Sequence, residues 1–98
     1  MVEKGFTKRQ KQNLAAYLGP STGEIRVEAK AVRKGAGVAY EWQCSTDGGT
    51  TWVTFSTTPV ASTHLLGATA GTVYLFRFRT TRKHTTSEWS ATVRLAVH

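Results

Sequence analysis

Residues 40–52 of this chain read Tyr-Glu-Trp-Gln-Cys-Ser-Thr-Asp-Gly-Gly-Thr-Thr-Trp, and they decide its fold class. Over the first five positions large and polar residues alternate, which is the period of a strand with one buried face. Asp47-Gly48-Gly49 then supplies a tight turn, because Asp favours turns and glycine adopts positive φ without steric cost. The stretch predicts a β-hairpin whose first strand turns Tyr40, Trp42 and Cys44 inward and Glu41 and Gln43 outward.

A second, longer run of the same kind covers residues 72–82. We expect Tyr74, Phe76 and Phe78 to face the core there, and Leu75, Arg77 and Arg79 to face solvent. Residues 83–86 are expected to form a loop. Further strand-like runs, bounded by turn residues, cover residues 24–32, 52–55, 62–66 and 92–97. This pattern predicts an all-β fold, an immunoglobulin-like β-sandwich of about seven antiparallel strands in two sheets.

The start of the chain allows two interpretations. Local propensity favours a helix that ends at the Gly19-Pro20 stop signal, yet residues 12–18 alternate as in a strand. We favour the strand, because the strand at residues 24–32 would otherwise form an unpaired edge. Residues 1–11 are then a basic, poorly ordered tail, and residues 12–98 form the domain.

Length and composition limit the chain to one modest core, since it has 98 residues and 40% hydrophobic content. The single cysteine, Cys44, cannot form an internal disulfide, so we expect it to pack as a small hydrophobic residue. No run approaches the ~18 apolar residues of a membrane span, and the first residues lack the apolar core of a secretory signal. We therefore expect no membrane insertion.

The formal net charge is +7, so the position of the charges matters more than their sum. Lysines and arginines form two blocks, within residues 4–34 and 77–94, and none lies from Gly35 to Phe76. In a sandwich we expect these two blocks on different sheets.

The order of these motifs resembles a fibronectin type III domain over residues 13–97. That family has a turn of the form Leu-x-Pro-Gly-Thr-x-Tyr, and residues 68–74 here read Ala-Thr-Ala-Gly-Thr-Val-Tyr. The Gly, Thr and Tyr are kept, while the family's Leu and Pro are both Ala. The resemblance implies that the Tyr74 hydroxyl bonds to the backbone of this turn.

More narrowly, residues 42–52 and Glu88-Trp89-Ser90 resemble blocks in small bacterial proteins that end in such a domain. The function of those proteins is largely unassigned. The resemblance implies that the chain is the C-terminal module of a longer bacterial or bacteriophage protein, with an extracellular, cell-surface or virion-associated location.

Residues 86–90, Thr-Ser-Glu-Trp-Ser, also resemble the Trp-Ser-x-Trp-Ser box of cytokine-receptor fibronectin domains, with the first Trp replaced by Thr. The resemblance implies that Trp89 lies against Arg77 or Arg79 in a cation–π contact. We favour this structural role. The alternative is an outward patch for a partner, because Trp and Arg are enriched at binding hot spots.

The sequence predicts no catalytic, metal or cofactor site. His64, His84 and His98 stand far apart, without the Cys or carboxylate spacing of a zinc site. Asp47 with Ser45 faintly resembles a calcium loop, but further acidic ligands are lacking, so a hairpin turn is the better account. A nucleophile and a base that converge in one pocket cannot be assembled from these motifs, which argues against an enzyme.

These observations favour a non-catalytic module that serves as a spacer or binds a protein or glycan within a larger protein. The alternative is polyanion or nucleic-acid binding through the basic tail and the arginines of residues 72–82. Nucleic acid is disfavoured, because the predicted aromatic residues face the core. The oligomeric state stays open, and an upstream segment could add a strand to a sheet edge. The candidate binding residues are Glu41, Gln43, Leu75, Arg77, Arg79, Trp89 and Arg94.

Overall fold

The computed structural model of the protein describes residues 13–30 and 37–97, and all the regular secondary structure of these residues is β. The predicted first strand is confirmed from Asn13 onward, and the helix interpretation of these residues is wrong. The predicted tail, residues 1–11, lies outside the described residues. In chain order the strands are β1 (Asn13–Leu18), β2 (Ile25–Lys30), β3 (Val38–Ser45), β4 (Val53–Thr58), β5 (Ser62–Leu65), β6 (Val73–Arg82), β7 (Thr85–Thr86) and β8 (Val93–Ala96).

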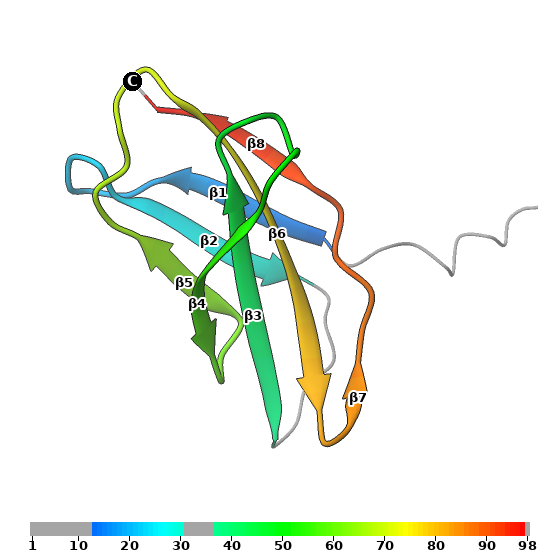
Figure 1. Ribbon diagram of the computed structural model, residues 1–98. Helices are drawn as coiled ribbons and strands as arrows, with labels where there is room; N and C mark the ends of the chain where they lie inside the picture. Colours follow the sequence, from blue (N-terminus) through cyan, green and yellow to red (C-terminus); the bar gives the residue numbers. More distant parts are fainter. Residues whose placement is uncertain (1–12, 31–36, 98) are drawn as a thin grey trace, which may run out of the picture.

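The strands form two antiparallel sheets that pack against each other (Figure 1). One sheet has the order β1-β2-β5. The other has the order β4-β3-β6, and both β7 and β8 pair with the remaining side of β6. The predicted all-β, immunoglobulin-like sandwich is confirmed.

The strand beside β6 is divided into two pieces, β7 and β8, so the described residues contain eight strands where about seven are predicted. Residues 83–86, predicted as a loop, contain the short strand β7, which pairs with the end of β6. The turn between them is tight because Lys83 takes the left-handed conformation, with φ 57°. The sequence pattern misses β7 because two exposed threonines carry no alternation.

The core lies between the sheets and consists of the side chains that the alternation turns inward. Trp42, Phe76 and Phe78 are each 0% exposed, as are Ile25 and Val27 from the opposite sheet. Burial of each such side chain contributes about 1.5–3 kcal/mol. The predicted inward faces of β3 and β6 are therefore confirmed.

Cys44 lies at the margin of this core as a free, partly buried thiol. Burial raises the pKa of the thiol above its usual value. The residue packs as a small hydrophobic side chain, as the sequence predicts.

A β-bulge between β3 and β4 adds one more ring to the core. Trp42 pairs with Ser56, but the next residue, Gln43, pairs with Thr54, so Phe55 is the extra residue. In a regular ladder Phe55 would stand opposite Gln43 and face solvent. Its ring instead packs edge-on against Phe76, with the ring centres 5.9 Å apart.

The turn before β6 is closed by Tyr74, as the family resemblance implies. The Thr69 backbone N–H donates a hydrogen bond of 3.0 Å to the Tyr74 hydroxyl. Ala68 packs against the core although the larger Leu of the family is missing. The bond ties the turn to the start of β6.

Within residues 13–30 and 37–97, no helix is long and apolar enough to cross a membrane.

Candidate binding face

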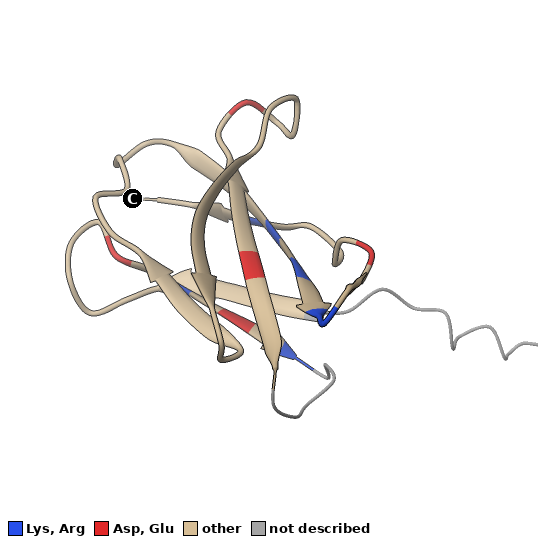
Figure 2. Ribbon diagram, turned by 60° about the horizontal axis from the view of Figure 1, so that its bottom comes forward, with Lys and Arg blue, Asp and Glu red and all other residues tan. Residues whose placement is uncertain are grey.

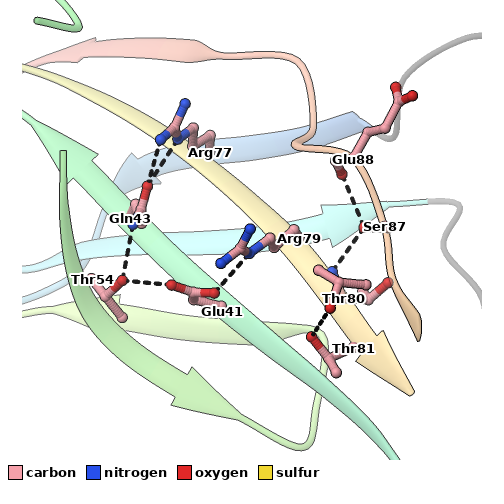
Figure 3. Close-up of polar contacts among 10 residues, drawn as sticks. Glu41, Gln43, Thr54, Arg77, Arg79, Thr80, Thr81, Ser87 and Glu88 are labelled. Atoms are coloured by element: carbon pink, nitrogen blue, oxygen red, sulfur yellow. Dashed lines mark hydrogen bonds and ion pairs between the residues drawn. The ribbon is translucent and has the colours of Figure 1, made fainter. Parts of the chain in front are cut away.

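The outward side chains of β3 and β6 stand in facing pairs on the solvent side of their sheet (Figure 3). Antiparallel pairing places Gln43 beside Arg77 and Glu41 beside Arg79. Each arginine therefore has a hydrogen-bond acceptor directly across the ladder, at the distance at which cross-strand side chains interact.

These pairs are joined into one chain of hydrogen bonds by Thr54 of β4 (Figure 3). Arg77 donates from Nε and Nη2 to the Gln43 Oε1 atom at 2.9 and 2.8 Å. Gln43 donates from Nε2 to Thr54 Oγ1 at 3.0 Å, and Thr54 donates to Glu41 Oε2 at 2.8 Å. Arg79 Nε closes the chain on Glu41 Oε1 at 2.8 Å. Both guanidinium groups are thus oriented by the strands next to them.

The Glu41 carboxyl stays ionised in this setting. Its burial raises the pKa, but hydrogen bonds from Thr54 and Arg79, together with the charges of Arg79 and Arg77, outweigh burial and hold the pKa below its usual value. The pKa of Arg77 is lowered by burial and by the nearby charge of Arg79. Neither shift moves a proton near neutral pH, so the chain of bonds keeps one arrangement there.

Two tryptophan rings and the two arginines form a stack on top of this network. The Cζ atom of Arg77 lies 4.1 Å from the centre of the Trp52 ring and 4.0 Å from that of Trp89. The Cζ atom of Arg79 lies 4.3 Å from the Trp89 ring centre. Side chains two positions apart on a strand are about 6.6 Å apart, which leaves room for one ring between the arginines. The order of the stack is Trp52, Arg77, Trp89, Arg79.

Trp89 is held over β6 by Ser87 and Ser90, which bond to β6 in the gap between β7 and β8. The Ser87 N–H donates to Thr80 O at 2.8 Å, and the Thr80 N–H donates to Ser87 Oγ at 3.0 Å. Ser90 repeats the arrangement with Phe78, at 2.8 Å for its N–H and 3.0 Å for its Oγ. Serine hydroxyls therefore accept the β6 bonds that carbonyl groups of a continuous strand would accept, which frees Trp89 to turn over the sheet.

Trp52 is brought to the same place by the turn between β3 and β4. The Asp47 carboxylate accepts bonds from the Thr51 hydroxyl at 2.5 Å, the Thr51 N–H at 2.9 Å and the Ser45 hydroxyl at 2.7 Å. The Thr51 hydroxyl and N–H, followed by the Ser45 hydroxyl, hold the pKa of Asp47 far below its usual range. Asp47 therefore serves the predicted hairpin turn.

Gly49 in this turn has φ +94°, and a Cβ there would lie 3.6 Å from Leu75 Cδ1 and 3.7 Å from Trp52 Cζ2. Leu75 thus flanks the Trp52 end of the stack. Arg94 on β8 pairs with Leu75 across the ladder and is exposed. We call this surface the ladder face, made of Glu41, Gln43, Trp52, Thr54, Leu75, Arg77, Arg79, Trp89 and Arg94.

All seven residues that the sequence suggests for binding lie on the ladder face, and Trp52 is a further member that the sequence pattern does not indicate. The pattern places Trp52 at the start of a strand, whereas β4 begins at Val53. Trp52 lies outside the strand ladder and can turn onto Arg77. A Trp shortly beyond the Gly48-Gly49 turn is the available signal, but its partner Arg77 is 25 residues away in the sequence and depends on strand register.

A polar groove of about 360 Å³ borders the β1-β2-β5 sheet. Its charged groups are already engaged, because Arg26 pairs with Glu24 at 3.1 Å and Glu28 accepts a bond from Tyr17 at 2.6 Å. Ser62 and His64 also line the groove, and within the described residues no hydrogen bond links the side chain of Ser62 to that of His64. The groove lining is Arg26, Glu28, Thr58, Ser62, Thr63 and His64.

No protein-family model matches the sequence, and no curated protein matches it. Among solved structures, a chain of a cytokine receptor complex in crystal form 1A matches 89% of this chain with a TM-score of 0.75 and 23% sequence identity. This chain spans 50% of the length of that one. At this identity the likeness shows the fold, a fibronectin type III-like or immunoglobulin-like β-sandwich.

Proposed function

We propose that this domain is a non-catalytic binding module of a larger protein and contacts a protein or glycan partner through the ladder face. The observation that carries the proposal is the stack of Trp52, Arg77, Trp89 and Arg79 on an open sheet surface. Trp and Arg are among the residues most enriched at binding hot spots. A surface in which they are already fixed loses little conformational entropy when a partner binds.

The state of the acidic groups supports a non-catalytic role. A general base works best with a pKa near the operating pH. The pKa of Glu41 lies below its usual value, and hydrogen bonds occupy both of its oxygens. The pKa of Asp47 is likewise lowered, and hydrogen bonds within its turn occupy both of its carboxylate oxygens. These two carboxylates suit positioning better than proton transfer.

A protein partner is favoured over a glycan by the arrangement of the rings. Sugars bind to tryptophan by stacking on an open ring face. The Trp89 ring has Arg77 and Arg79 within 4.3 Å of its centre, so a sugar would have to displace a cation. A protein partner can instead use the guanidinium edges and the side chain of Leu75.

The proposal is tested by screening the purified domain against a glycan array and a random peptide library, with each hit mapped by amide chemical shifts in NMR. We expect hits that shift the amides of β3, β6 and β8. Hits that map to the β1-β2-β5 sheet contradict the role of the ladder face. A screen without hits leaves the domain as a spacer.

A further inference from the structure

The described charges are distributed unequally between the two sheets (Figure 2). On residues 13–30 the cations Arg26 and Lys30 balance the acids Glu24 and Glu28. The rest of the described chain holds five cations against three acids, and every one of the five belongs to β6, its turn or β8. They are Arg77, Arg79, Arg82, Lys83 and Arg94.

The three acids offset only part of this positive charge, and on the ladder face Glu41 alone stands against Arg77, Arg79 and Arg94. Asp47 lies in the β3–β4 turn with its oxygens bonded to Thr51 and Ser45. Glu88 is exposed on the segment between β7 and β8, and Glu41 pairs with Arg79. Within the described residues, no ion pair involves Arg77 or Arg94. The ladder face therefore carries surplus positive charge that an acidic partner can neutralise.

Arg77 and Arg79 stand two positions apart on β6, and Arg94 stands on the neighbouring strand β8, level with Leu75. Measured along the strand direction, the three arginines mark successive alternate positions, with Arg94 displaced sideways by one strand, about 4.8 Å. The repeat along the strand is about 6.6 Å, which is also the repeat of side chains on one face of an extended peptide. The known bonds of Arg77 use Nε and Nη2, and that of Arg79 uses Nε. The remaining guanidinium N–H groups are available to carboxylates.

From this we infer that the partner of the ladder face is an acidic protein segment that lies extended along β6 with carboxylates at alternate positions. The inference rests on the proposed function and names its partner class.

A protein segment fits better than nucleic acid or a sulfated glycan. Glu41 stands among the arginines and would repel a continuous polyanion, whereas a protein can place a donor beside it. The Trp89 ring is flanked by cations and cannot stack on a base without displacing one. Leu75 adds an apolar contact that a peptide side chain can cover.

The test is a random peptide library selected on the domain, followed by affinity measurements on Arg94→Glu and Lys30→Glu. The two variants change the net charge equally, on different sheets. We expect peptides enriched in Asp or Glu at alternate positions, a loss of about tenfold in affinity in Arg94→Glu, and little change in Lys30→Glu. Affinity should also fall as salt is added. Amide spectra of both variants report whether the fold is intact.

Each other outcome contradicts a different statement. Peptides that bind the ladder face without acidic enrichment overturn the acidic segment and leave the proposed function standing. Peptides that never map to the ladder face overturn both. An equal loss in Lys30→Glu means that net charge alone is responsible. Tighter binding of single-stranded DNA or a heparin oligosaccharide, lost in Arg94→Glu, means that the partner class is wrong.

Discussion

Trp89 makes two cation–π contacts in the stack and Trp52 makes one, so the two residues should differ in their contribution to stability. Each such contact is worth about 0.5–1 kcal/mol at an exposed site. We expect Trp89→Ala to lower the free energy of unfolding more than Trp52→Ala, by about one contact. Urea unfolding measures both, and Trp89→Phe should recover part of the loss. Equal losses in the two alanine variants would show that the rings act only through buried area.

Asp47 should make stability depend on acid pH. Its pKa is depressed in the folded protein and close to about 3.9 in the unfolded chain, so its stabilisation is complete above that value. The stabilisation is lost progressively as the pH falls below about 4 toward the folded value. We expect Asp47→Asn to melt below the wild type at pH 7 and the gap to close in acid. A gap that is constant with pH would mean that the Asp47 charge contributes nothing.

At the scale of elements, the edge beside β6 depends on the two serine hydroxyls. In Ser90→Ala the Phe78 N–H loses its acceptor in a buried position, since Ser90 is 3% exposed. An unsatisfied buried donor costs about 1–3 kcal/mol. The matched control is Ser62→Ala, which removes an exposed hydroxyl on β5 and should cost little. Similar melting temperatures for the two variants would contradict the role of Ser90.

Most elements could be predicted from the sequence because their side chains alternate. The inward faces of β3 and β6 and the strand at Asn13 follow from period-two patterns and from the need to pair β2. The bulge at Phe55 and the short strand β7 could not be predicted, because neither leaves a mark in the alternation. The hydrogen bonds of Ser87 and Ser90 to β6 form where the strand beside β6 breaks between β7 and β8, so they could not be predicted from the sequence either.

For the molecule as a whole, the candidate face could be predicted only in part. The outward positions of Arg77 and Arg79 follow from the pattern of one strand, but the choice of Gln43 or Glu41 as partner depends on the register between β3 and β6. Register joins residues more than 30 positions apart and is set by turns and core packing together. The β3–β4 turn brings Trp52 onto Arg77. The sequence predicts that a turn is present there, but not the path of the chain that places Trp52.

The three tryptophans of the chain occupy two kinds of surroundings, and quenching of their fluorescence can distinguish the buried ring from the two outer rings. Trp42 is 0% exposed, whereas Trp52 and Trp89 are partly exposed beside fixed cations. A negatively charged quencher such as iodide should be drawn to the outer pair, and caesium should be repelled. The difference between quenching by iodide and quenching by caesium therefore reports on these cations without a label. A partner that binds the cations should remove this difference.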